Sequence, residues 1–204
     1  AIEAHLSGGL PSLSIVGLPE TAVREARDRV RSALLQGGFE FPARRITVNL
    51  APADLPKDGG RYDLGIALAL LAASGQVPAP ALAACEVLGE LGLDGTLRPV
   101  RGVLPAALAA AREDRALIVP TANAAEAALA GHPCVHPAPD LLAVCAHLRG
   151  AQALPVHVPA TPVPASDGPD LAEVRGQPQA RRALEIAAAG GHSLLMLGPP
   201  GAGK

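Results

Sequence analysis

The sequence has 204 residues, of which 49% are hydrophobic and 1% aromatic, and its formal net charge is −2. This length and apolar content suffice for a domain with its own core, so the chain is not a disordered tail. The near-neutral charge excludes a globally basic surface for nucleic acids, and the scarcity of aromatic rings excludes a base-stacking platform.

The cysteines and the apolar runs indicate the compartment. Cys85, Cys134 and Cys145 are odd in number and show no C-x-x-C spacing, which argues against a disulfide framework and a zinc site. No apolar run reaches the length of a membrane span. The sequence therefore predicts a cytoplasmic protein with reduced thiols and no membrane partner.

Apolar periodicity predicts an α/β domain with a mixed sheet over residues 1–150, because strands and helices alternate along the chain. The helix after the first strand begins near Pro19 and has an apolar face. The predicted elements are a strand at 12–16, a helix at 20–36, a strand at 44–50, a helix at 64–73, a hairpin at 86–100 with Asp94–Gly95 at its turn, a helix at 104–112, a strand at 116–120, a helix at 121–130, a short strand near Val135 and a helix at 138–148.

A linker and a second unit follow. Residues 151–169 are rich in proline and lack periodicity, which is typical of an extended linker. Residues 170–204 open a second unit, for which the sequence predicts a helix at about 178–189, a buried strand at 193–197 and a glycine-rich loop.

The loop "GPPGAGK" fits the first seven positions of the phosphate-binding pattern G-x-x-x-x-G-K-[ST], directly after the apolar run. Its glycines let backbone N–H groups surround phosphate oxygens, and its lysine reaches the terminal phosphates. The alternative is an ordinary Gly/Pro turn. The predicted nucleotide-binding residues are Gly198, Pro199, Pro200, Gly201, Ala202, Gly203 and Lys204.

The cofactors expected from this loop are ATP and Mg²⁺, bound by a longer parent protein. The hydroxyl-bearing residue that would hold Mg²⁺ follows the lysine in the pattern, and the sequence ends at Lys204. We therefore expect the chain to be a fragment that neither hydrolyses ATP nor holds a cofactor firmly by itself.

A second stretch, "EVRGQ" at 173–177, resembles the V-x-GQ element of AAA+ ATPases. In those proteins the backbone near the valine and the glycine lies against adenine. The resemblance assigns this role to Val174 and Gly176, whereas the residues alone predict only a turn into a helix.

Two segments of the first domain resemble the peptidase domain of Lon proteases, which has a ribosomal-protein-S5-domain-2-like fold. "PKDGGRYDLGIA" corresponds to the Lon stretch "PKDGPSAGIA", and "RPVRGVL" to "LPIGGLK". The position of the catalytic serine then falls on Asp63, and that of the lysine on Leu104. A serine–lysine dyad needs a hydroxyl and an amine, so we expect a Lon-like fold without peptidase chemistry. The alternative for "PKDGG" is a glycine turn before a core helix.

Nearly the whole chain resembles the Mg-chelatase-like AAA+ ATPases of the ComM/YifB type. The resemblance implies a Lon-like domain ahead of an AAA+ motor, which forms a hexameric ring and migrates branched DNA in natural transformation and recombination. Its partners would be further copies of itself and branched or single-stranded DNA. Two alternatives are an ATP-dependent Lon-type peptidase and a pure interaction domain. The matching stretches are 5–42, 44–76, 89–105 and 173–204.

Three arginines on one side of the helix at 20–36, Arg24, Arg27 and Arg31, are candidates for DNA or subunit contacts. The alternative is a solvated face, because neighbouring charges are spaced for helical ion pairs. Those expected pairs are Glu20–Arg24, Arg24–Asp28 and Glu25–Arg29.

A polar loop around Lys57, Asp58 and Arg61 is also expected at the surface. The histidines are scattered along the chain. His132 and His136 flank Cys134 in a loop, but their spacing is not that of a zinc site, so we expect no metal centre.

Overall fold

The structure is a computed structural model that describes residues 1–158, 168 and 170–203. The chain divides into two compact units, Ala1–Pro159 and Ala160–Lys204. Lys204 and residues 159–167 and 169 lie outside the described residues.

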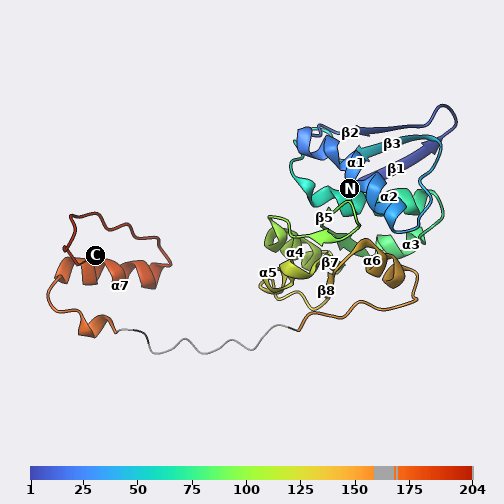
Figure 1. Ribbon diagram of the computed structural model, residues 1–204. Helices are drawn as coiled ribbons and strands as arrows, with labels where there is room; N and C mark the ends of the chain where they lie inside the picture. Colours follow the sequence, from blue (N-terminus) through green and yellow to red (C-terminus); the bar gives the residue numbers. More distant parts are fainter. Residues whose placement is uncertain (159–167, 169, 204) are drawn as a thin grey trace. The chain divides into compact units, whose positions relative to one another are not determined.

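The first sheet of unit 1 has the order β1-β3-β2, in which β1 (Ile2–Ser7) is antiparallel and β2 (Ser12–Val16) parallel to the central β3 (Arg45–Leu50). The strands predicted at 12–16 and 44–50 are confirmed, and β1 was not predicted. Helices α1 (Thr21–Gln36) and α2 (Asp63–Ala73) cover one face of this sheet (Figure 1). The α1 side chains expected to face the core are fully buried, namely Val23, Ala26, Val30, Ala33 and Leu34.

The second sheet is entirely parallel, with the order β4-β7-β8. Its strands are β4 (Cys85–Val87), β7 (Ala116–Pro120) and β8 (Val135–Ala138). Helices α4 (Val103–Arg112) and α5 (Ala124–Ala128) lie on one side of it and α6 (Leu141–Leu148) on the other (Figure 1). The short helix α3 (Ala79–Ala83) precedes β4. Parallel and antiparallel pairs with helices between them confirm a mixed α/β fold.

Several predicted boundaries change for identifiable reasons. The hairpin is confirmed only between β5 (Glu90–Leu91) and β6 (Leu97–Arg98), because 85–87 joins the second sheet instead. The helix predicted at 138–148 begins at Leu141, since Asp140 caps it by accepting a hydrogen bond from the Ala143 amide at 2.8 Å. The helix predicted at 121–130 is a 3₁₀ turn, Thr121–Asn123, followed by α5.

The first residues of the predicted linker pack on unit 1. The Leu154 side chain is buried, and the His157 amide donates to the Val135 carbonyl at 2.8 Å. The Pro155 carbonyl lies 3.2 Å from Nδ1 of His136. A boundary predicted at residue 150 assigned these residues to the linker, but their contacts belong to the first unit.

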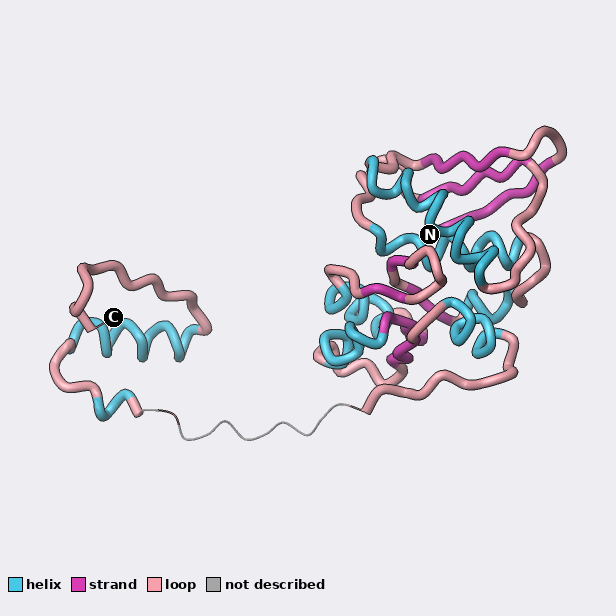
Figure 2. Tube along the Cα trace, viewed as in Figure 1, coloured by secondary structure: helices cyan, strands magenta, loops and turns pink. Residues whose placement is uncertain are grey.

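Unit 2 contains a 3₁₀ turn, Leu171–Glu173, and helix α7 (Pro178–Gly190). The helix is confirmed, but the buried strand predicted at 193–197 is wrong. These residues form a loop (Figure 2), with Leu195 79% and Leu197 86% exposed. A strand needs a hydrogen-bonded neighbour, and the described part of unit 2 has no strand to supply one.

No helix among the described residues is both long and apolar enough to cross a bilayer.

The buried thiol of Cys145 in α6 makes unit 1 sensitive to alkali. Burial raises its pKa from 9.0 to about 12, so the folded thiol stays protonated while the unfolded thiol ionises. We expect stability to fall as pH rises from about 9 to 12, by roughly 1.4 kcal/mol per pH unit from this group. Urea unfolding at several pH values measures the slope. Cys145→Ala should reduce the slope, although Cys85, whose pKa burial also raises, still contributes. Cys134→Ala, at an exposed thiol, should leave the slope unchanged, and equal slopes in all three proteins would refute the assignment.

Candidate functional site

The glycine-rich loop lies on the surface of unit 2, with residues 198–203 all exposed. Gly201 and Gly203 have positive φ angles of 82° and 68°, which favour glycine because it has no Cβ. The Ala202 amide donates to the Pro199 carbonyl at 3.2 Å and closes a turn. A Cβ at Gly201 would meet nothing within 4 Å, so the loop backbone is accessible to a phosphate.

The predicted adenine-side element lies against this loop. The Gln177 side-chain amide donates to the Ala202 carbonyl at 3.0 Å, although the residues are 25 positions apart. Gly176 and Gln177 both have positive φ angles, 71° and 52°, and this turn aims the glutamine at the loop. The structure therefore brings together the loop that the glycine pattern predicts to bind phosphate and the V-x-GQ segment that only the resemblance links to nucleotide. Gln177 was not among the predicted site residues, although it completes the V-x-GQ pattern.

Val174 is 39% exposed, and its carbonyl accepts from Arg181 Nη1 at 3.5 Å. The predicted Lys204 lies outside the described residues. An exposed glycine backbone can offer N–H donors to anionic oxygens, which is the chemistry that the sequence pattern predicts for this loop.

Asp63, at the position of the Lon serine, is fully buried at the start of α2. Arg29 of α1 donates to both carboxylate oxygens, Nε to Oδ2 at 2.6 Å and Nη2 to Oδ1 at 3.1 Å. The Leu91 amide donates to Oδ2 at 3.2 Å. The carboxylate therefore joins α1, α2 and β5, and all three contacts are structural.

Burial raises the pKa of Asp63, while the hydrogen bonds from Arg29 and from the Leu91 amide oppose that rise. The hydrogen bond to Asp63 raises the pKa of Arg29. Three N–H donors converge on a group that accepts best when ionised, so we assign the ionised form to this pair at neutral pH.

Leu104, at the position of the Lon lysine, is half-buried in the first turn of α4. Its amide donates to Glu126 Oε1 at 3.2 Å. Asp63 and Leu104 thus form hydrogen bonds with different residues. Neither carries the hydroxyl or the amine that the peptidase reaction requires.

The three predicted arginines of α1 lie at the surface and make different contacts. Arg24 Nε donates to the Pro19 carbonyl at 3.3 Å, Arg27 pairs with Asp28 at 3.3 Å, and Arg31 stacks 4.8 Å above the Phe41 ring. Of the expected helical ion pairs, Glu25–Arg29 is confirmed at 3.7 Å. The other two are wrong among the described residues, because Arg24 turns back to Pro19.

The loop around Lys57 differs from its prediction. Asp58 is exposed, but Lys57 is only 5% exposed, and its Nζ donates to the Pro52 carbonyl. The lysine backbone pairs with the segment before α1, with the Glu20 amide donating to the Lys57 carbonyl at 3.1 Å. This pairing carries the side chain inward. Among the described residues, no group of three or more His, Cys, Asp or Glu side chains could hold a metal ion.

Comparisons with known proteins identify the family. A family model described as "Subunit ChlI of Mg-chelatase" matches residues 2–123, and one described as "Magnesium chelatase, subunit ChlI" matches residues 170–204. YifB of Salmonella typhimurium is 55% identical over 203 residues, which cover 100% of this chain and 40% of the relative. The competence protein ComM of Haemophilus influenzae is 52% identical over 208 residues, which cover 100% of this chain and 41% of the relative. The chain thus spans about two fifths of the length of these relatives. It belongs to the Mg-chelatase-like family that contains ComM and YifB.

Proposed function

We propose that the chain is the N-terminal region of an ATP-binding Mg-chelatase-like AAA+ protein. Unit 1 is its Lon-like domain without peptidase chemistry, and unit 2 begins the ATPase. The hydrogen bond from Gln177 to Ala202 carries the proposal, because it joins the V-x-GQ turn to the phosphate loop. Backbone amides of Gly201 and Gly203 would hold phosphate oxygens, Lys204 would reach the terminal phosphates, and Val174 and Gly176 would lie against adenine.

In the whole protein, hydrolysis of bound ATP would supply the energy, and the hydroxyl-bearing residue that follows the lysine in the motif would hold Mg²⁺. In this chain the proposed task of the loop is binding and orientation of the nucleotide. The Gln177 side chain fixes the Ala202 carbonyl, so the loop keeps its conformation before the nucleotide arrives.

We further propose that the whole protein is a hexameric, ATP-driven motor that migrates branched or single-stranded DNA in the cytoplasm. The proposal rests on the family resemblance, and the name of the Haemophilus relative, competence protein ComM, agrees with a role in natural transformation. The two alternative functions are a Lon-type peptidase and a pure interaction domain. The buried Asp63–Arg29 pair argues against the peptidase, and the glycine loop argues against a pure interaction domain.

The nucleotide assignment can be tested with Gln177→Ala in the full-length protein. Loss of one hydrogen bond that holds the loop should weaken binding of Mg-ATP roughly fivefold, and Lys204→Ala should abolish measurable binding. Isothermal titration calorimetry measures both. Gln179→Ala, at an exposed glutamine in the first turn of α7, is the matched control. Equal affinities for the two glutamine variants would sink the proposed role of Gln177, and full affinity in Lys204→Ala would sink the phosphate loop.

The arginine-bearing face of α1 can be tested in the same protein. A triple variant should show weaker DNA-stimulated ATP hydrolysis or weaker hexamer formation; it combines Arg24→Ala, Arg27→Ala and Arg31→Ala. Each of these changes should lower the free energy of unfolding by at most about 0.5 kcal/mol. ATPase rates against DNA concentration and sedimentation measure the two effects. Phosphate contacts would also make the DNA response salt-dependent and independent of sequence. Arg101→Ala with Arg112→Ala, at exposed arginines elsewhere, is the control; a triple variant that assembles and responds to DNA normally would show that this face only contacts solvent.

A further inference from the structure

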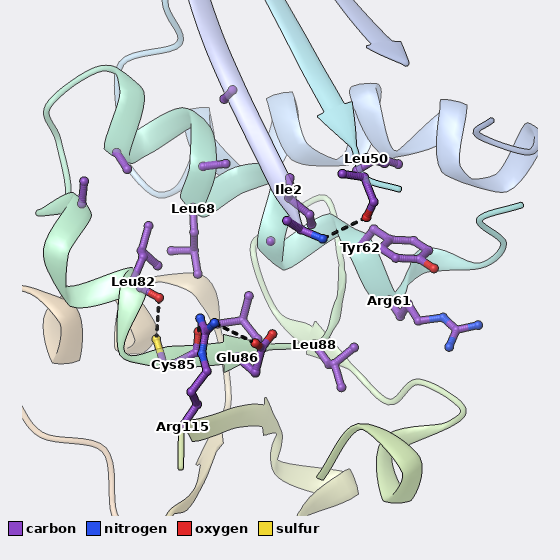
Figure 3. Close-up of a pocket in the computed structure, with 18 of the residues that line it drawn as sticks. Ile2, Leu50, Arg61, Tyr62, Leu68, Leu82, Cys85, Glu86, Leu88 and Arg115 are labelled. Atoms are coloured by element: carbon purple, nitrogen blue, oxygen red, sulfur yellow. Dashed lines mark hydrogen bonds and ion pairs between the residues drawn. The ribbon is translucent and has the colours of Figure 1, made fainter. Parts of the chain in front are cut away.

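A cleft of about 870 Å³ lies in unit 1 where the two sheets approach each other (Figure 3). Its lining includes Ile2 and Ala4 of β1 and residues 85–87 of β4. Each of these strands forms the edge of its own sheet. Gly65 of α2 lies between them, because a Cβ there would be 2.5 Å from Ile2 Cδ1 and 3.6 Å from Val87 Cγ2. The volume lies in the usual range for small-molecule sites.

The walls of the cleft are mainly aliphatic. Leu68 of α2 and Leu82 of α3 point into it (Figure 3), and Leu88 lies on the β4 side. Much of the remaining wall consists of alanines, such as Ala69 and Ala72 of α2 and Ala79 of α3. Short methyl side chains on two adjacent helices leave this volume open, and the wall would favour an aliphatic ligand body.

Lys57 lines the same cleft. Lys57 is 5% exposed, and its Nζ donates to the Pro52 carbonyl. Within the described residues, no carboxylate forms an ion pair with it. A buried ammonium group usually has an anionic partner, because desolvation of an unpaired charge is costly. An anion in the cleft would supply that partner.

Arg115, which also lines the cleft, has a buried donor without an acceptor among the described residues. Its Nη1 pairs with Glu86 at 3.2 Å and its Nη2 donates to the Cys85 carbonyl at 3.0 Å (Figure 3). Its buried Nε has no hydrogen-bond partner among the described residues. Buried polar groups without partners are rare in native proteins, and a ligand that binds beside them is one explanation.

We propose that this cleft binds a small amphipathic molecule with an aliphatic body and one anionic headgroup, a carboxylate or a phosphate monoester. Lys57 would pair with the headgroup, and the alanine and leucine walls would hold the aliphatic body. A strand-like peptide is a poorer fit, because Arg115 already occupies the Cys85 carbonyl on the β4 edge. The site is distinct from the nucleotide loop and gives unit 1 a ligand-binding role of its own.

Calorimetric titration of the 204-residue chain tests the site with four probes: laurate, dodecyl phosphate, dodecanol and inorganic phosphate. We expect saturable binding, one molecule per chain, for laurate, dodecyl phosphate or both. Dodecanol should bind roughly tenfold more weakly, because it lacks the charge that Lys57 compensates. Inorganic phosphate should not bind measurably, because it lacks the aliphatic body.

Two variants separate the site from nonspecific adsorption. Lys57→Met should remove the preference for an anionic headgroup, while dodecanol still binds. The control Arg112→Met, at an exposed arginine, should keep that preference. Ala72→Phe should fill the cleft and abolish binding, whereas Ala109→Phe, at an exposed alanine of α4, should not. Circular dichroism and the melting temperature verify that each variant is folded.

Four results would overturn the proposal: no saturable binding of either anion, an unchanged headgroup preference in Lys57→Met, unchanged binding in Ala72→Phe, or displacement of laurate by an uncharged apolar hexapeptide amide.

Discussion

Replacing Gly17 by alanine is expected to lower the free energy of unfolding by about 3 kcal/mol or more. Gly17 follows β2 and has a φ of 99°, a conformation that L-residues with a side chain rarely adopt. A Cβ at this position would overlap the Leu50 carbonyl oxygen and lie 2.9 Å from the carbonyl carbon. Both obstacles are backbone, so the strands must move apart to relieve them.

A Gly9→Ala variant is the matched control, because it separates the backbone strain of a positive φ from steric overlap with a neighbouring strand. Gly9 also has a positive φ, 126°, but a Cβ there would meet nothing within 4 Å. Gly9→Ala should therefore cost only the conformational strain, about 1 kcal/mol. Urea unfolding of the whole chain, followed by circular dichroism, compares the two midpoints at constant m-value. A Gly17→Ala variant no less stable than Gly9→Ala would show that the end of β3 adapts to the added methyl group.

Strong local periodicity predicted most of unit 1. Alternation predicted β3, and the spacing of Val23, Val30 and Leu34 predicted α1, because one face of each element is buried. The strand β1 carries the same alternation, with Ile2, Ala4 and Leu6 more buried than Glu3 and His5. The signal was therefore present in the sequence, and the period-2 rule applied from the first residue would have found this strand.

Burial of charged residues could not be predicted in the same way. Lys57 lies in a polar, glycine-rich stretch that indicates an exposed loop, but pairing with the chain before α1 draws its side chain inward. Such pairing is a tertiary contact between segments that local patterns do not connect. The strand predicted at 193–197 fails for a related reason, since an apolar run becomes a strand only where a neighbouring strand accepts its hydrogen bonds.

The candidate nucleotide site was predictable in composition but not in geometry. The pattern of glycines identified the loop at 198–203, and resemblance identified Val174 and Gly176. The contact from Gln177 to Ala202 depends on the positive φ of two consecutive residues, and the sequence permits that turn without requiring it.

Removing either partner of the Arg29–Asp63 pair is expected to destabilise unit 1 by about 3–5 kcal/mol, because the remaining charge stays buried and unpaired. Asp63→Ala leaves the guanidinium and the Leu91 amide without their acceptor, and Arg29→Met leaves a fully buried carboxylate. Replacing both, as Arg29→Met with Asp63→Leu, should cost less than the sum of the single changes, since neither charge then remains. Urea unfolding of the two single variants and the double variant measures this coupling. Arg27→Met, at an arginine that is 56% exposed, is the control and should change stability by about 0.5 kcal/mol or less.

Substitution of Asp63 also tests whether this residue has a structural role or only occupies the position of a catalytic serine. Asp63→Ser restores the hydroxyl that the Lon resemblance expects, but it breaks the ion pair and leaves Leu104 without an amine to activate the new hydroxyl. We therefore expect a destabilised protein that cleaves neither unfolded casein nor fluorogenic peptides, with or without nucleotide. Adding Leu104→Lys supplies the missing amine, but it does not restore the partner of Arg29, so the stability loss should persist. An Asp63→Ser variant as stable as the wild type would contradict the structural role of Asp63. Peptide cleavage by the wild-type chain that a single serine substitution abolishes would contradict the non-catalytic assignment of unit 1.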